Sequence, residues 1–181
     1  MKYILSILMI VGLTLSSYSK SKEVGENIDV THYEIHLNEI NVADRIIDAT
    51  TIITLKTLTS IDGIELELKS LDVTSVTSDD AIINNFSQNG DVLSVTFGNP
   101  VTANTTISLT VNYGGTTFNE NWGGIHWSND YVYNLGVGFD SQPHNLGKTW
   151  FPCVDNFTDK ASFDLYITYP DNMLSSCGGL L

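Results

Sequence analysis

The sequence predicts an all-β protein built as a saddle-shaped or sandwich-like arrangement of mostly antiparallel sheets. Apolar and polar residues alternate along several short runs, which is the pattern of strands with one buried face. Thr, Ile, Val, Asn and Gly dominate the composition, as strands and turns require. Beyond the first twenty residues, no long window shows a helical period.

Six runs carry the alternation, and we expect each to form a strand: 32–37, 50–55, 64–69, 92–97, 106–113 and 161–169. Four glycine-containing stretches between or after them read as turns: Asp62-Gly63, Asn89-Gly90, Gly98-Asn99-Pro100 and Gly114-Gly115. Asn89-Gly90 has the composition of a two-residue hairpin turn. Short strands with such punctuation are typical of a sandwich or of paired sheets.

The first residues have the pattern of a secretory signal peptide. A positive start, Met1-Lys2, precedes an apolar run from Ile4 to Leu15, and small residues end at Ser19. The apolar run is shorter than the roughly 20 residues of a membrane-spanning helix. We therefore expect a signal peptide at 1–19, a short lead at 20–28 and a single β-domain at 29–181. The protein is then exported, periplasmic or extracellular, with no membrane span after cleavage; an uncleaved anchor is the alternative.

The charge of the chain excludes one class of partner. Asp and Glu number 21 against 8 Lys and Arg, for a net charge of −13. Nucleic-acid binding requires Lys and Arg to neutralise phosphates, so we expect no nucleic-acid partner. The charge is typical of solubility outside the cell, and no D-x-D-x-D loop indicates a calcium site.

His32 and His36 have the spacing of the zinc motif H-E-x-x-H, but we expect no metal there. That motif depends on a helix, and its Glu directly follows the first His. Alternation predicts a strand for 32–37, which separates the two imidazoles by roughly 13 Å. Glu34 also follows Tyr33 rather than His32. The pair therefore predicts a solvated strand face.

The segment 150–170 carries a family resemblance. It reads Pro152-Cys153-x-Asp155, then Lys160-Ala161-x-Phe163, and it ends at Pro170. This pattern resembles the signature that closes the N-terminal β-domain of the zinc aminopeptidase family, to which aminopeptidase N and leukotriene hydrolase belong. Weaker resemblance extends back to about Asp29. It implies structural roles for Pro152, Cys153, Asp155, Lys160, Ala161 and Phe163.

The same resemblance points to two substrate-binding candidates and one ion pair. Gln142 matches a family Gln, and His144 lies where a Glu or Gln helps to hold the free amine of the substrate. A neutral imidazole is a poor substitute for a carboxylate facing an ammonium group. Lys148 stands where the family often has an Arg in a structural ion pair. The family's Glu-Pro after the Asp is replaced by Asn156-Phe157.

Aromatic residues gather in the glycine-rich segment 119–150, and we single out Trp122, Trp127, Tyr131 and Tyr133. They are candidates for binding a ligand or docking a partner, because aromatic rings stack on sugars and peptides. They are equally suited to packing under the rim of a sheet. Both readings stay open at this point.

The two cysteines, Cys153 and Cys177, allow one disulfide in an exported chain. The resemblance instead implies a buried thiol at Cys153. Neither cysteine has a sequence neighbour that indicates a nucleophile.

The catalytic half of the resembled family carries H-E-x-x-H with a distal Glu and a Gly-x-Met-Glu-Asn loop, and this sequence contains neither. Zinc that activates water needs three protein ligands and an open position. We therefore expect the non-catalytic N-terminal domain of an exported zinc aminopeptidase, with no catalytic residue, metal or cofactor in this chain. Zinc is expected in the absent catalytic domain, which is the expected partner, and the peptide substrate is contacted only indirectly.

The alternative is a stand-alone secreted β-sandwich module that binds a glycan or a protein through its aromatic loop. A severed domain should expose an apolar docking face. An independent module should remain monomeric.

Overall fold

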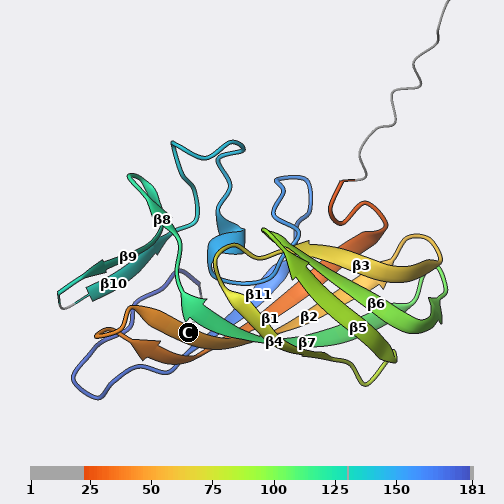
Figure 1. Cartoon of the computed structure of the whole chain (residues 1–181), viewed down its shortest axis with the longest axis horizontal. Helices are drawn as coiled ribbons and strands as arrows, with labels where there is room; N and C mark the ends of the chain where they lie inside the picture. The colour runs from red at the N-terminus through yellow and green to blue at the C-terminus, as the bar shows by residue number, and fades with distance from the viewer. Residues whose placement is uncertain (1–22, 130, 180–181) are drawn as a thin grey trace, which may run out of the picture.

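The computed structural model describes residues 23–129 and 131–179, so the signal peptide expected at 1–19 lies outside the described residues. Three sheets make up the chain (Figure 1). The largest, in spatial order, contains β11 (Ser162–Ile167), β1 (Ile28–Asn41), β2 (Ile46–Thr57), β7 (Thr106–Thr116) and β4 (Asp72–Thr77). The second contains β3 (Ile61–Glu67), β6 (Val92–Val101) and β5 (Ile83–Asn89). The third contains β10 (Tyr131–Leu135), β9 (Gly123–Ser128) and β8 (Asn119–Glu120).

The predicted fold class is confirmed. Every strand pair is antiparallel except β1 with β11, which run parallel. The other regular element of the described residues is a single 3₁₀ turn, η1 (Gly147–Thr149). In Figure 1 the second sheet lies over one end of the five-stranded sheet and the third sheet over the other end, which gives the molecule its saddle shape. No helix of the described residues is long and apolar enough to cross a membrane.

The core lies between the five-stranded sheet and the second sheet, and it is built from the faces that alternation predicted. Ile53 at the centre of β2 is fully buried and lies opposite Tyr33 of β1 and Leu109 of β7. From the other side come the buried side chains of Leu66 on β3 and Leu93 on β6. Burial of one face fixes the register, because a slip by one residue would turn every apolar side chain to solvent.

Three of the four predicted turns are wrong, and close approach of backbones explains two of them. Gly114 lies inside β7 opposite Asp48, where an added Cβ would meet the Ile47 carbonyl oxygen at 2.6 Å. Gly63 lies inside β3, where a Cβ would meet the Val95 carbonyl oxygen at 2.4 Å. Gly98 continues β6. In these strands glycine marks close contact between neighbouring strands rather than a turn of the chain.

The fourth predicted turn is confirmed. Asn89 of β5 pairs with Val92 of β6, and Gly90 between them has a φ of 59°, in the left-handed region that this hairpin turn requires.

The predicted strand at 161–169 forms as β11, but its apolar face is only partly covered. β11 is an edge strand of the five-stranded sheet. Leu165 and Ile167 are half-buried, whereas Phe163 is 56% exposed.

Substitution of Gly114 by Ala should lower the free energy of unfolding by about 1–3 kcal/mol, because the new Cβ meets the backbone of the paired strand. Gly136→Ala is the matched control, since a Cβ there has no atom within 4 Å. Urea unfolding followed by circular dichroism measures both. Equal stabilities of the two variants would contradict this reading of Gly114.

Candidate functional site

The loop between β10 and η1 lies against the turn between β8 and β9. An added Cβ on Gly123 would lie 2.7 Å from the Cα of Gly138, so the two backbones touch. The loop closes on itself through hydrogen bonds from the amide of Gly138 to the His144 carbonyl, 2.8 Å, and from Leu146 to Gly136, 2.9 Å. These contacts give the loop a fixed shape above the third sheet (Figure 1).

Glu120 clamps the loop to β8. Its carboxylate accepts hydrogen bonds from the amide of Asp140 at 3.0 Å and from the hydroxyl of Ser141 at 2.5 Å. The hydrogen bond from Ser141 is the main reason that the pKa of Glu120 is lowered below its ordinary value. Glu120 therefore remains a carboxylate under ordinary conditions.

Gln142 and His144 occupy the exposed tip of this loop and contact each other. Nδ1 of His144 lies 2.8 Å from the carbonyl oxygen of Gly138, which can only accept, so Nδ1 carries the proton. Nε2 of His144 then accepts the hydrogen bond from the side-chain amide of Gln142, at 3.1 Å. Through these two hydrogen bonds His144 orients the side chain of Gln142.

The aromatic candidates separate into exposed and packed residues. Trp122 is 62% exposed and Tyr131 64% exposed, and Tyr133 stacks on His126 with ring centroids 5.1 Å apart. Trp127 instead packs against the core, and its indole N–H donates to Thr117 at 2.8 Å. The first three are exposed to solvent, whereas Trp127 contributes to packing.

Buried hydrogen bonds hold the segment 150–155 between the sheets. Cys153 and Glu67 exchange backbone hydrogen bonds of 3.0 and 2.8 Å. The hydroxyl of Tyr33 accepts from the amide of Val154 at 3.1 Å, and the hydroxyl of Tyr113 donates to the Trp150 carbonyl at 3.0 Å. Burial raises the pKa values of both tyrosines, so both hydroxyls stay neutral.

An ion-pair cluster lies beside this segment, as predicted for Lys148. Its ammonium is 2.5 Å from Oε1 of Glu67 and 3.9 Å from Oδ2 of Asp155. Burial lowers the pKa of Lys148, but the hydrogen bond and charge of Glu67, together with Asp155, outweigh it and leave that pKa raised. Asp155 also accepts from the amides of Gly147 and Lys148, so its carboxylate fixes the 3₁₀ turn.

The two cysteines are both free, with Cys153 buried and Cys177 exposed, so no disulfide joins them. Burial, followed by the nearby charge of Asp155, raises the pKa of the Cys153 thiol well above its ordinary value. A neutral, buried thiol is unreactive.

The two histidines of β1 lie on the outer face of the five-stranded sheet. His36 is 2.7 Å from the carboxylate of Glu34 and stacks on Tyr166 of β11. His32 is 2.8 Å from the hydroxyl of Ser162. Across residues 23–129 and 131–179, no three His, Cys, Asp or Glu side chains are grouped to hold a metal ion.

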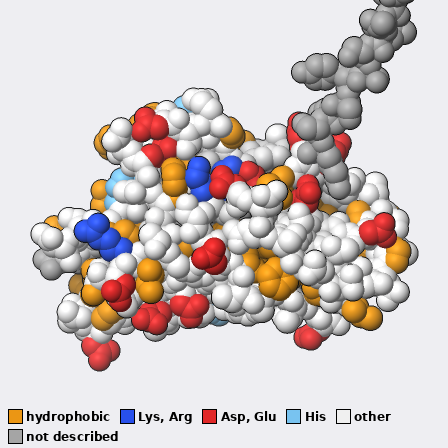
Figure 2. Space-filling view, in the orientation of Figure 1, with side chains coloured by type: hydrophobic (Ala, Val, Ile, Leu, Met, Phe, Trp, Pro, Cys, Tyr) orange, Lys and Arg blue, Asp and Glu red, His pale blue; other side chains and the backbone are white. Residues whose placement is uncertain are grey.

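An apolar groove of about 780 Å³ separates the third sheet from the five-stranded sheet. Ile47 and Leu165 line one side and Ile125 and Val132 the other, with the C-terminal stretch 172–178 along it. Tyr131 and Tyr133 stand at the same groove, so its exposed rim is aromatic. Figure 2 shows hydrophobic side chains reaching the surface at this end of the molecule.

A family model for the Peptidase M1 N-terminal domain matches residues 29–178. The chain belongs to this family. The match includes the loop with Gln142 and the segment from Pro152 to Phe163. Among curated proteins, no sequence matches the chain.

Solved structures of M1 zinc metallopeptidases share the fold. One from Deinococcus radiodurans, in a substituted form bound to a Tyr-Ser-Ala substrate, is 22% identical, with a TM-score of 0.66 over 78% of this chain and 32% of its own. The unsubstituted enzyme of that organism gives a TM-score of 0.65, with the same identity and coverage. A two-domain M1 zinc metallopeptidase bound to L-tryptophan gives 0.66 at 22% identity, over 78% and 33% of the two chains. This chain therefore spans about a third of the length of these relatives.

Within the M1 N-terminal domain, the residues of the predicted signature lie apart. Pro152, Cys153 and Asp155 are in the buried segment, whereas Lys160 and Phe163 lie outside it and are exposed. Ala161, half-buried, precedes β11.

Sequence reasoning did not identify Glu120 or Phe139, which the structure places beside the Gln142 loop. Phe139 is 70% exposed and contacts Trp122 edge to face, with centroids 6.1 Å apart. The only sequence signal for Phe139 was its position three residues before Gln142. The role of Glu120 depends on contacts with residues about twenty positions away.

Lys148→Met should lower the free energy of unfolding by about 3 kcal/mol, because it leaves the carboxylates of Glu67 and Asp155 facing each other without a cation. Lys148→Arg keeps the charge and should retain most of the stability. Thermal and urea unfolding measure both variants. A Lys148→Met protein as stable as the parent would show that the ion pairs do not stabilise the segment.

In the native protein at pH 8, a thiol reagent such as DTNB should modify one cysteine, and in denaturant two. Cys177→Ser should leave no reactive thiol in the native state. Because the pKa of Cys153 is raised in the folded state, its contribution to stability is complete below the ordinary thiol pKa and declines as the pH rises beyond it. Modification of both thiols in the native state would contradict the burial of Cys153.

Proposed function

We propose that this chain is the N-terminal domain of an exported zinc-dependent aminopeptidase and that it is inactive alone. The observation that carries the proposal is the family match over residues 29–178. Relatives with this fold are zinc metallopeptidases whose chains are about three times as long as the part matched here. One of them binds a Tyr-Ser-Ala substrate, and we propose peptides as the substrates of the whole enzyme.

Zinc belongs in this proposal to the catalytic domain. The residues described here do not fit the metal, because catalytic zinc requires three nearby protein ligands and none are grouped in this way. No chemical step is therefore assigned to this chain.

The apolar groove and its aromatic rim are the proposed contact with the catalytic domain. Leu165 and Val132 face each other across the groove, and Tyr131 and Tyr133 are exposed at its rim. Leu174, in the C-terminal stretch that lines the groove, is 97% exposed. A contiguous apolar surface of this kind on a small domain is typical of a surface buried by another domain.

Gln142 is the proposed contribution of this domain to the amine pocket of the substrate. The loop is rigid, the residue is at its exposed tip, and His144 fixes the orientation of its amide. The side-chain oxygen of Gln142 is able to accept a hydrogen bond from an ammonium group. His144, hydrogen-bonded to Gly138, supports Gln142 rather than replacing a carboxylate.

A second candidate is a stand-alone secreted module that binds a glycan or a protein, favoured by the exposure of Trp122 and Tyr131. The two functions differ in solution behaviour. A separated domain should bind its catalytic domain through the groove, and Leu165→Asp should abolish that binding. A module should stay monomeric and lose ligand binding in Trp122→Ala without unfolding.

The test of the proposed function begins by reading the gene beyond codon 181. An in-frame H-E-x-x-H with a distal Glu is expected. In the protein made from that longer frame, Gln142→Ala should raise KM for amino-acid p-nitroanilides about tenfold, since one charge-assisted hydrogen bond to the amine is lost. The chain ending at Leu181 should show no hydrolysis. A stop codon followed by unrelated sequence would overturn the proposed function. Wild-type kinetics for Gln142→Ala would overturn the proposed role of Gln142.

N-terminal sequencing of the secreted protein tests the export part of the proposal. A mature chain that begins near Lys20, recovered from the periplasm or medium, is the expected result. Recovery of the protein only from the cytoplasm would contradict it.

A further inference from the structure

An exposed pair of aromatic rings, not used by the groove, lies beside the Gln142 loop. Trp122 is 62% exposed and Phe139 is 70% exposed, and the rings meet edge to face with centroids 6.1 Å apart. Large apolar side chains that are exposed together, rather than singly, mark an interaction site.

The frame that carries the pair is rigid without any ligand. The amide of Phe139 donates to the carbonyl of Trp122 at 3.2 Å, and the side-chain amide of Asn121 donates to Asp140 at 3.1 Å. The carboxylate of Glu120 fixes the same loop by accepting hydrogen bonds from Asp140 and Ser141. A preformed surface loses little entropy when a ligand binds.

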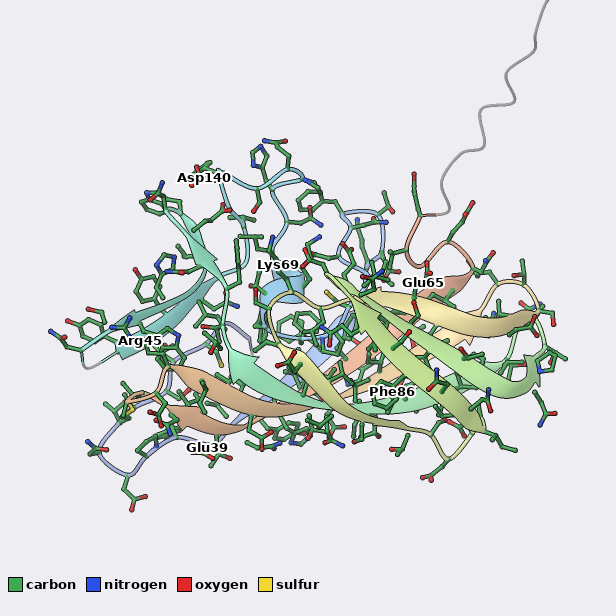
Figure 3. All side chains as sticks on the ribbon, viewed as in Figure 1. Glu39, Arg45, Glu65, Lys69, Phe86 and Asp140 are labelled. Atoms are coloured by element: carbon green, nitrogen blue, oxygen red, sulfur yellow. The ribbon has the colours of Figure 1, made fainter. Side chains whose placement is uncertain are left out.

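The charged side chains of the loop and sheet that carry the pair are acidic. Glu120 and Asp140 supply two carboxylates, and the sequence from 119 to 147 contains neither Lys nor Arg. Lys69 contributes to the field at Glu120, but its ammonium lies over the ring of Phe118 and 3.7 Å from Asp91. Figure 3 shows Asp140 at the outer part of the loop, well separated from Lys69 in that view. A cation supplied from outside would complement this surface.

We propose that Trp122, Phe139 and Asp140 form a subsite for a cationic side chain, Lys or Arg, of a bound peptide. A guanidinium or ammonium group is attracted to the face of an indole ring, and a nearby carboxylate adds to that attraction. The identification of the ligand as a peptide rests on the proposed function.

The position of the subsite indicates which part of the peptide it contacts. Phe139 and Asp140 directly precede Ser141 and Gln142, and the loop is closed by the hydrogen bond between Gly138 and His144. A peptide whose amino end is held at Gln142 therefore has its next residues beside the aromatic pair. The subsite gives the enzyme a preference for basic residues near the amino end of its substrates.

The experiment uses the chain itself and probes that lack a free amine. N-acetyl-L-arginine methylamide carries the cation, and the matching citrulline compound is nearly the same shape without the charge. Titration is followed by the amide resonances of Phe139 and Asp140 and by the indole N–H resonance of Trp122 in ¹H–¹⁵N correlation spectra. The arginine probe should bind about twofold to fivefold more tightly than the citrulline probe, which is the size of one exposed cation–π contact.

Variants assign the binding to the subsite. Phe139→Ala and Asp140→Asn should each weaken arginine binding about twofold to fivefold. Phe157→Ala is the matched control, because it removes an equally exposed phenylalanine ring outside both the Gln142 loop and the groove and should leave arginine binding unchanged. Equal affinity for the arginine and citrulline probes would overturn the proposal and leave the rings as part of the docking face. So would wild-type binding in both Phe139→Ala and Asp140→Asn.

The arginine titration and the test of the proposed function can fail independently of each other. The capped probes have no amino end for Gln142 to hold, and they need no catalytic domain. Absence of a downstream zinc motif would remove the peptidase and leave the cation subsite standing. Failure of arginine binding would remove the subsite and leave the family function standing.

Discussion

The segment from Gly147 to Asp155 is held between two sheets by buried polar contacts, and the geometry of the candidate site depends on it. Tyr33 of β1 and Tyr113 of β7 anchor it from the larger sheet, and Glu67 anchors it from β3. The buried side chain of Asn145 donates to the Asp155 carbonyl and so extends this anchoring to the Gln142 loop. Because buried polar groups without partners are costly, these hydrogen bonds exclude other positions of the segment.

Strands were predicted correctly from the sequence where apolar and polar residues alternate and one face of the strand is buried. Ile53, Leu109 and Leu93 lie in runs that alternate strictly, and each is buried as expected. The prediction failed for β4, where Val76 is the one buried residue, because so short and polar a strand has no clear pattern. It also took Gly114 for a turn, since the close approach of β2 that demands glycine is a tertiary contact.

The candidate site was predictable to the extent that it rests on local sequence. The resemblance around Pro152 and the aromatic residues around Trp122 were both read from short stretches of sequence. The hydrogen bonds of Glu120 and the contact of Trp122 with Phe139 could not be predicted, because each joins segments that are separated by the two strands β9 and β10. The residue types of the candidate site could therefore be predicted from the sequence. Their arrangement beside Gln142 and His144 depends on the fold and could not.

The parallel pairing of β1 with β11 has a consequence for how the domain folds. His32 and Ser162, which lie opposite each other, are 130 positions apart in the chain. Non-local pairing of this kind delays folding, because the entropy of closing a long loop is lost before the contacts form. The first strand therefore keeps one edge unpaired until β11 has been synthesised, and the five-stranded sheet is complete only then.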